Sequence, residues 1–468
     1  MNTIFRRGTT ALIISLVFSV GSFSQKVSKA GSISEQNVRA EMNFLASDAM
    51  QGRGSGTQFE RIAAEYIGSQ FMQFGLEAAG DNGVDGKKTY VQTVETSRSA
   101  RLKALQFGRT GNPFVLGKDW VALSISSADV SGPLRKMELS DSAKAGEVVF
   151  VKLQENDAMQ TIQPAIMKFF KDGAAAVLVS ETKELRERWS QINERKPALS
   201  QRGTFLVVSN DMAGAISNFE NGTALEIHAS FSEPEKANTW NAIGKLTGSD
   251  PVLSPQVILI SSHLDHLGVR ANAPTDDKIF NGADDDASGT VAVLELARTL
   301  ATGKRPKRTV YFVCFGSEEV GGAGANYFVT NLPFPKDKLV ANLEFEMIGR
   351  PDAAVKPDEL WLTGFERSNL GPELAKRGAK LVQDPHPDQN FFMRSDNFTL
   401  ARQGIIAHTV SSYGLHKDYH QASDEIRTID FSHMTRSISS MVGPVQWLVN
   451  SNFVPAWNEG KNPSLPPR

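Results

Sequence analysis

The second half of the chain alternates short runs of apolar residues with longer stretches in which apolar residues recur at helical spacing. From about Trp240 onward, each apolar run has the length of a buried strand. Ser288–Leu300, whose apolar residues lie three and four positions apart, predicts a helix. Alternating strands and helices favour a mostly parallel sheet with helices on both faces. The predicted strands are Val257–Ser261, Thr309–Phe315, Leu339–Phe345, Glu359–Thr363 and Ile405–Val410.

Two helices are predicted near the beginning of the chain. Ser32–Met50 is the first, and Thr57–Phe74 is the second, which ends at Gly75. Between them, the stretch Gly52–Gly56 is rich in glycine. It lacks the Lys-Ser/Thr pair of a phosphate-binding loop, so we interpret it as a plain loop.

The region between these two parts, 101–235, has a different pattern. Its short apolar runs, such as Glu147–Leu153 and Ala174–Val179, are separated by polar loops, and Gln163–Lys171 predicts a helix. We find no cluster of reactive side chains in it, and we interpret it as a separate β-rich α/β domain. The predicted organisation is a signal peptide (1–24), the first part of the main domain (25–100), an inserted domain (101–238), the second part of the main domain (239–452) and a loosely held tail (453–468).

Composition and charge narrow the class of protein. The chain has 468 residues and a net charge of -2, with no long run of Lys or Arg, so nucleic acid is not an expected partner. The length suits two domains. Cys314 is the only cysteine, which excludes a disulfide within the chain. The composition does not indicate an oligomeric state.

The first residues are typical of an export signal. Arg6 and Arg7 precede the apolar stretch Ala11–Val20, and the small residues Ser22 and Ser24 suit cleavage near position 24. The apolar stretch is shorter than the roughly 20 residues that a membrane-spanning helix needs, so stable membrane insertion is not expected. We therefore expect an exported protein, periplasmic or extracellular.

Acidic residues and histidines follow the predicted strands directly. Ligands of open α/β sheets bind at the carboxyl ends of the strands, so these side chains are expected to meet there. Imidazole and carboxylate groups are ligands that Zn²⁺ accepts, and no cysteine stands among the residues that follow these strands. The residues concerned are His263, Asp265 and His266 after one strand, Glu318 and Glu319 after the next, then Glu346, then His416, Tyr419 and His420, with Asp284–Asp286 before the helix at Ser288.

These motifs, in this order, resemble the co-catalytic zinc aminopeptidases, a family that includes bacterial leucyl aminopeptidases, aminopeptidase Y and relatives of glutamate carboxypeptidase. The resemblance runs from Trp240 to about Met434 and implies the zinc exopeptidase fold. Lys168–Ala174 is similar to a protease-associated domain, which many members carry as an insertion. The motifs that carry the family resemblance are His263-Leu264-Asp265, Asn281 to Gly289, Glu318 to Gly321, Glu346 to Arg350, Arg394-Ser395-Asp396 and Tyr419-His420.

The resemblance implies a role for each residue. His263 and Glu346 would hold one zinc ion, Glu319 and His420 a second, and Asp285 would bridge the two. Asp265 would orient His263, Glu318 would be the general base, and Tyr419 would donate to the developing oxyanion. The expected substrates are peptides with a free amino terminus. His266 and His416 are interpreted as neighbours of the site that do not bind metal.

One position departs from the family pattern. Aminopeptidases of the family usually carry Asp where this chain has Glu346, and the longer side chain moves the carboxylate outward. Glu344, two residues earlier on the same strand face, competes for the role. A single-zinc enzyme is the alternative that this departure leaves open.

Other functions on the same scaffold stay open at the level of sequence. A carboxypeptidase or dipeptidase needs a cation for the substrate carboxylate, which Arg350 or Arg394 could supply. A glutaminyl cyclase uses a similar zinc scaffold. A non-catalytic binding protein is the alternative from another class, but such relatives lose zinc ligands, whereas all five positions here hold competent residues.

Overall fold

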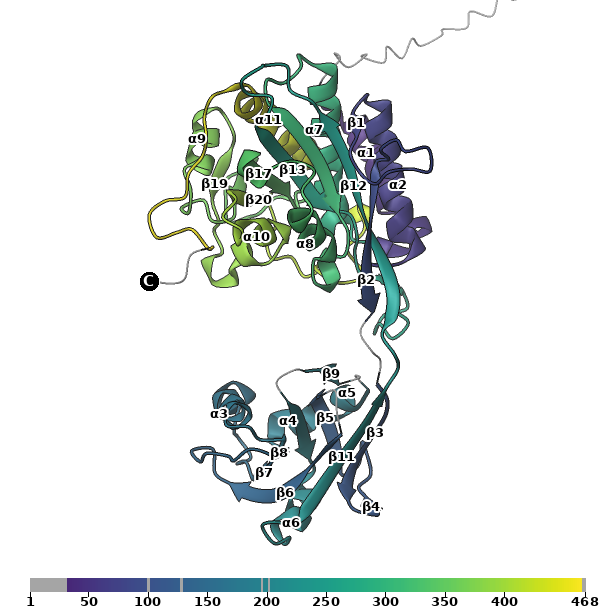
Figure 1. The fold of residues 1–468 in the computed structure, drawn as a ribbon, viewed down its shortest axis with the longest axis vertical. Coiled ribbons are helices and arrows are strands. Elements are labelled where there is room, and N and C mark those ends of the chain that lie inside the picture. Colours follow the sequence, from purple (N-terminus) through teal and green to yellow (C-terminus); the bar gives the residue numbers. More distant parts are fainter. Residues whose placement is uncertain (1–31, 99–101, 127–128, 195–196, 201–202, 465–468) are drawn as a thin grey trace, which may run out of the picture. The chain divides into compact units, whose positions relative to one another are not determined.

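The structure of the chain is a computed structural model, which describes residues 32–98, 102–126, 129–194, 197–200 and 203–464. The predicted signal peptide lies outside these residues. The chain divides into two compact units, one formed by residues 1–95 and 238–468 and the other by residues 96–237 (Figure 1). The sequence analysis placed the inserted domain at 101–238. None of the described helices is long and apolar enough to cross a membrane.

The larger unit is built on a mixed sheet. Its strands lie in the order β1-β12-β16-β13-β17-β20-β18-β19, and β2 also pairs with β12. The central pairs β16-β13, β13-β17 and β17-β20 are parallel, while β12-β16 and β18-β20 are antiparallel. The strand bounds are β1 Glu77–Ala78, β2 Val91–Arg98, β12 Glu235–Leu246, β13 Val257–His263, β16 Thr309–Phe315, β17 Leu339–Phe345, β18 Leu360–Leu362, β19 Leu381–Gln383 and β20 Ala407–Ser411, and a separate small sheet pairs β14 Gly268–Val269 with β15 Ile279–Phe280.

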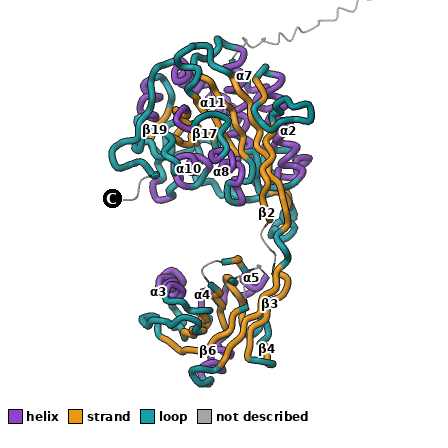
Figure 2. Tube along the Cα trace, in the orientation of Figure 1, coloured by secondary structure: helices purple, strands orange, loops and turns teal. Residues whose placement is uncertain are grey.

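Helices cover both faces of this sheet, as the purple segments around the orange strands show (Figure 2). Alternate residues of β13 enter different cores: Ile258 and Ile260 pack with α1, α2, α7, α9 and α11, whereas Val257 and Leu259 pack with α8 and α10. This two-sided burial explains why β13 and β16 consist mostly of apolar residues. The helix bounds are α1 Glu35–Leu45, α2 Gln58–Gln73, α7 Gly289–Thr302, α8 Ala323–Thr330, α9 Leu370–Lys376, α10 Asp396–Ala401 and α11 Phe431–Asn450.

The smaller unit has a sheet of its own, with apolar clusters on both faces. The strand order is β4-β3-β11-β6-β7-β8-β10-β5-β9. It is thus a β-rich α/β domain inserted into the larger one, and the predicted fold class is confirmed for both parts. Its elements are β3 Leu102–Arg109, β4 Asn112–Pro113, β5 Trp120–Ile125, β6 Val130–Met137, β7 Val148–Val151, α3 Met159–Lys171, β8 Ala176–Ser180, α4 Lys183–Glu187, α5 Trp189–Glu194, β9 Ala198–Leu199, β10 Thr204–Val208, α6 Asn210–Ser217 and β11 Ala224–Phe231.

A buried histidine in β20 makes the stability of the larger unit sensitive to acid. Both ring nitrogens of His408 are engaged, Nδ1 with the carbonyl oxygen of Thr363 at 2.7 Å and Nε2 with the hydroxyl of Ser368 at 2.7 Å. Burial lowers the pKa of His408 from 6.5 to about 4. Between these pH values His408 is protonated in the unfolded chain and neutral in the folded chain. The free energy of unfolding therefore decreases as the pH falls.

We expect the wild type to lose about 2 kcal/mol more unfolding free energy between pH 7 and pH 5 than His408→Gln. Urea titrations followed by tryptophan fluorescence test this, because the ring of Trp457 lies 5.5 Å from that of His408. Equal pH dependence in the two proteins would show that this histidine is not the acid-sensitive group.

Candidate metal centre

The predicted metal ligands come together at the carboxyl ends of the central strands. His263 is the last residue of β13, Glu319 follows β16 and Glu346 follows β17. His420 lies in the loop after β20, and Asp285 lies just before α7. Because these strands are parallel, their carboxyl ends share one edge of the sheet, and residues far apart in the chain meet there.

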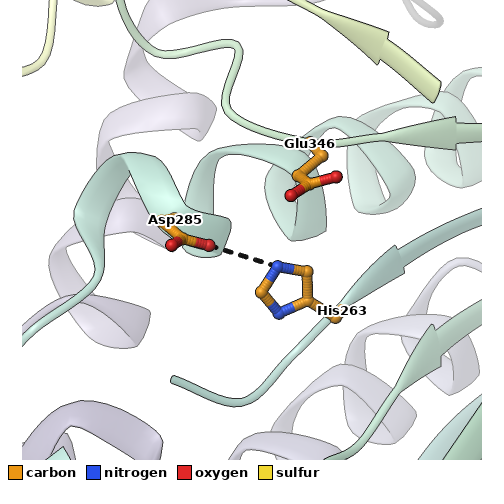
Figure 3. Close-up of side chains that lie close together, drawn as sticks. All are labelled: His263, Asp285 and Glu346. Atoms are coloured by element: carbon orange, nitrogen blue, oxygen red, sulfur yellow. Dashed lines mark ion pairs between the residues drawn. The ribbon is translucent and has the colours of Figure 1, made fainter. Parts of the chain in front are cut away.

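One group of possible ligands consists of His263, Asp285 and Glu346, with one ligand atom of each within 4.8 Å of the others. The Nε2 atom of His263 lies 3.2 Å from Oδ1 of Asp285. Figure 3 shows the carboxylates of Asp285 and Glu346 on the same side of the His263 ring. An ion between them would have three protein ligands, which leaves a position for water.

A second group shares the carboxylate of Asp285. It contains His266, Asp285 and Glu319 within the same limit of 4.8 Å. His420 joins it through Nε2, which lies 3.2 Å from Asp285 Oδ2 and 3.2 Å from Glu319 Oε2. Asp285 therefore has one oxygen near His263 and the other near His420, as a bridging ligand requires. The sequence analysis left His266 out of the ligand set, and the structure brings its ring into the group.

Several buried polar atoms of this centre have no hydrogen-bond partner. They include Nε2 of His263, Nδ1 of His266 and Oε1 of Glu319. Unpaired buried polar groups cost free energy, and a cation bound between them would remove that cost. Imidazole nitrogens and carboxylate oxygens without thiolates form a donor set that suits Zn²⁺. The residues present therefore fit zinc.

The electrostatics of the centre also favour a cation. Burial acts to raise the pKa of Asp285, but contact with His263 and His420 outweighs it and holds that pKa well below its usual range. Burial raises the pKa of Glu346 to about 8. Carboxylates crowded in a poorly solvated site resist ionisation, and a bound divalent cation restores the charged form.

The three consecutive aspartates before α7 have different roles: one is a possible metal ligand, and the other two accept hydrogen bonds from the backbone. Only Asp285 faces the metal groups. Asp286 accepts hydrogen bonds from the backbone amides of His263 (3.2 Å), Gly289 (2.9 Å) and Met347 (3.1 Å), and so ties three elements together. Asp284 accepts from the amide of Gly349 at 2.8 Å and contacts His416 Nε2 at 2.9 Å.

The structure separates the two glutamates that competed for one ligand position. The carboxylate of Glu344 accepts from the amide of Asn397 at 2.6 Å, from Ser395 Oγ at 3.2 Å and from Thr409 Oγ1 at 3.2 Å. These hydrogen bonds hold the carboxylate of Glu344 away from the ligand groups. Glu346 is the one that joins His263 and Asp285.

Asp265 connects the first ligand to the predicted base. Its carboxylate accepts from the amide of Glu318 at 3.0 Å and from the hydroxyl of Ser55 at 2.5 Å. Nδ1 of His263 lies 3.2 Å from the backbone oxygen of Asp265 and 3.8 Å from its carboxylate. Asp265 thus contacts both His263 and the loop that carries Glu318. That Asp265 orients His263 remains a prediction.

The ring of Tyr419, predicted to act on the oxyanion, stacks on that of His420 with ring centroids 3.9 Å apart. Its hydroxyl accepts from Arg394 at 3.3 Å. Tyr419 and Arg394 both line a small cavity next to Glu346, whose apolar wall includes Trp361 and Phe391. Tyr419 therefore contacts a residue of the metal centre and also lines the cavity.

The glycine-rich stretch near the beginning of the chain has a role that sequence reasoning missed. Arg53 is 1 % exposed, and its guanidinium donates to the carbonyl oxygens of Leu264 (2.8 Å), Leu45 (2.6 Å), Asn281 (2.8 Å) and Gly282 (2.9 Å). It therefore joins the loops that carry His263 and Asp285. An arginine between flanking glycines was the only signal in the sequence.

The fold and this geometry agree with the comparisons with known proteins. Residues 241–442 match the sequence model of peptidase family M28. This chain carries a peptidase family M28 domain. That stretch includes all five predicted zinc ligands, so the family resemblance seen in the sequence is confirmed.

The curated relatives of this chain match only part of it. A leupeptin-inactivating enzyme of Streptomyces exfoliatus is 36% identical over 118 residues, which are 25% of this chain and 24% of that protein. An aminopeptidase of Pseudomonas aeruginosa is 33% identical over 121 residues, 25% of this chain and 20% of that protein. A probable leucine aminopeptidase 2 of Aspergillus oryzae is 30% identical over 182 residues, 37% and 34% of the two chains. The matches thus span about a third or less of these relatives' own length.

Solved structures share the fold of this chain over most of its length. An aminopeptidase from Aneurinibacillus sp. strain AM-1 superimposes with a TM-score of 0.60 at 17% identity, covering 91% of this chain and 96% of that one. A zinc aminopeptidase from Bacillus subtilis gives a TM-score of 0.53 at 16% identity, with 91% and 97% covered. At these identities the comparison establishes the fold alone.

Proposed function

We propose that this protein is an exported zinc aminopeptidase that hydrolyses the amino-terminal peptide bond of peptides. The observation that carries the proposal is the sharing of one buried carboxylate, that of Asp285, by two groups of possible ligands beside Glu318. His263, Asp285 and Glu346 would hold one zinc ion. Asp285, Glu319 and His420 would hold the other. Two ions roughly 3.5–4 Å apart are typical of co-catalytic hydrolases.

Bound zinc would supply a water whose pKa is lowered to about 7 and would polarise the scissile carbonyl group. Glu318 would take the proton from that water and return it to the leaving amine. Burial, opposed by His263 and reinforced by Asp396, raises the pKa of Glu318 well above its usual range. A carboxyl group that holds a proton readily suits this transfer. Tyr419 would donate to the developing oxyanion.

The pocket beside Glu346 supports a preference for apolar amino-terminal residues. Trp361, Phe391 and Tyr413 provide aromatic surface along it, and Met347 adds a flexible apolar side chain. An apolar side chain that lies against this wall would lose contact with water, and burial of apolar surface is favourable by about 25 cal/mol per Å². The printed names of several relatives, leucine aminopeptidases, agree with this preference.

A carboxypeptidase is the second candidate, because one of the two arginines that could bind a substrate carboxylate lines the pocket. Arg350 is committed to structure, because it donates to Asp418 at 2.8 Å and to Asp424 at 3.2 Å. Arg394 lines the pocket beside Glu346 and is positioned to meet a substrate carboxylate. We also propose that the inserted unit is a protease-associated domain.

The proposal is tested by zinc content and by substrate blocking on the same purified protein. We expect about two zinc ions per chain, hydrolysis of leucyl anilides with a free amine, and none of the amino-acetylated versions. Activity should disappear with chelator and return with zinc. Hydrolysis of amino-blocked peptides that have a free carboxyl end would favour the carboxypeptidase instead. Absence of both zinc and turnover would contradict catalysis altogether.

A further inference from the structure

The side chain of His266 is fully buried and faces the second group of possible ligands. Its residue is 0 % exposed, and neither ring nitrogen makes a hydrogen bond. Nδ1 lies 2.7 Å from Oε1 of Glu319 and 3.8 Å from Oδ2 of Asp285. Oε1 of Glu319 makes no hydrogen bond either. Two buried polar atoms therefore approach each other without the alignment of a hydrogen bond, beside the bridging carboxylate.

The backbone around His266 holds its ring in this place. The amide of His266 donates to the carbonyl oxygen of Arg53 at 3.2 Å. Gly282 has a φ of 58°, and a Cβ atom at this position would lie 2.2 Å from the backbone oxygen of Asp285 and 2.4 Å from Cγ of His266. A residue with a side chain would thus displace the ring. The glycine opens the space that the imidazole fills, which is typical of a preorganised ligand.

We propose that His266 is a fourth protein ligand of the zinc ion held by Asp285, Glu319 and His420. This inference rests on the metal centre of the proposed function. The two ions would then differ: one with four protein ligands, two of them imidazoles, and one with three, namely His263, Asp285 and Glu346. Four protein ligands close a zinc site, whereas three leave a place for water. The four-ligand position would fill first and bind more tightly, and the three-ligand position would hold the reactive water.

The placement of the general base agrees with this division. The charges of His263, Glu346 and Glu319 all act on Glu318, and the first two of these residues are ligands of the three-ligand position. A base next to the ion that keeps an open position can reach the water bound there. His266 lies on the other side of Asp285, with Glu319 and His420; its ring centroid is 5.8 Å from that of His420.

The test is metal binding by the full-length protein, with His266→Asn as the variant. Metal-free protein is titrated with Zn²⁺ against a chromogenic chelator, and in parallel with Co²⁺, whose visible spectrum reports coordination number. We expect the wild type to bind one ion tightly and one more weakly. In His266→Asn the affinity for the tightly bound ion should fall by more than about 100-fold, which exceeds the loss typical of residues that only support a ligand. The visible spectrum of the first equivalent of bound Co²⁺ should also change.

The matched control is His416→Asn, because His416 contacts Asp284 outside both ligand groups. This variant should leave the affinity for the tightly bound ion and the spectrum of bound Co²⁺ unchanged. Thermal unfolding of the metal-free proteins verifies that both variants fold. Weaker binding with an unchanged Co²⁺ spectrum would assign His266 to orienting Glu319 and overturn the ligand role, as would unchanged binding. A wild type that binds no zinc would instead overturn the proposed function.

Discussion

Replacement of Glu318 by Gln should lower kcat by about 10²- to 10⁴-fold while zinc content stays at the wild-type level. Glutamine keeps the size of the side chain and its backbone contact with Asp265, since that contact uses the amide of residue 318. It cannot take a proton from water. Because Glu318 belongs to neither group of possible ligands, KM and metal binding should change little. Steady-state kinetics on a leucyl anilide together with zinc analysis measure both quantities.

The control for this variant is Glu220→Gln, an exposed glutamate of the inserted unit. It should have wild-type kinetics. If Glu318→Gln lost zinc in proportion to activity, the residue would be a ligand. If it kept full activity, another group would have to be the base.

Replacement of Asp285 by Asn should have the largest effect of any single substitution at the centre. The carboxylate contacts His263 through one oxygen and His420 through the other, so its charge serves both ligand groups. An amide is a poor zinc ligand, and we expect zinc content to fall from two ions toward none. The activity should fall by about 10³-fold or more, since the metal supplies several kcal/mol of transition-state stabilisation.

Asp388→Asn, on an exposed turn, is the matched control for the loss of one carboxylate. Zinc analysis after dialysis and activity with added zinc are the measurements. A variant that retains two zinc ions after dialysis would show that Asp285 does not bridge them. Restoration of activity by excess zinc would show that only affinity had been lost.

The main features of the sheet could be read from the sequence because its central strands are buried on both faces. Thr309–Phe315 is almost wholly apolar, and Leu339–Phe345 is apolar except for Asn342 and Glu344. The two predicted strands match β16 and β17 residue for residue. Parallel strands place the residues that follow them at one edge, so the positions of Glu319 and Glu346 followed from pattern alone. The strand predicted at Ile405–Val410 begins later, at Ala407.

The sequence could not decide roles that depend on contacts between distant parts of the chain. Arg53 reaches Leu264 and Gly282 across 211 and 229 positions, which no local pattern encodes. The choice between Glu344 and Glu346 likewise depended on Asn397, which takes up the carboxylate of Glu344. His266 was set aside as a neighbour because its proximity to Glu319 exists only in the folded loop.

The contacts of Arg53 also bear on how the gene could be shortened. The stretch recognised as M28, 241–442, begins inside β12 and ends inside α11. A fragment cut to those limits would lack the guanidinium that joins Leu264 to Asn281 and Gly282, as well as helices α1 and α2. The segment 241–442 is thus an incomplete folding unit, and the ends of a recombinant protein are better chosen from the contacts of residues 35–73 than from the limits of family recognition.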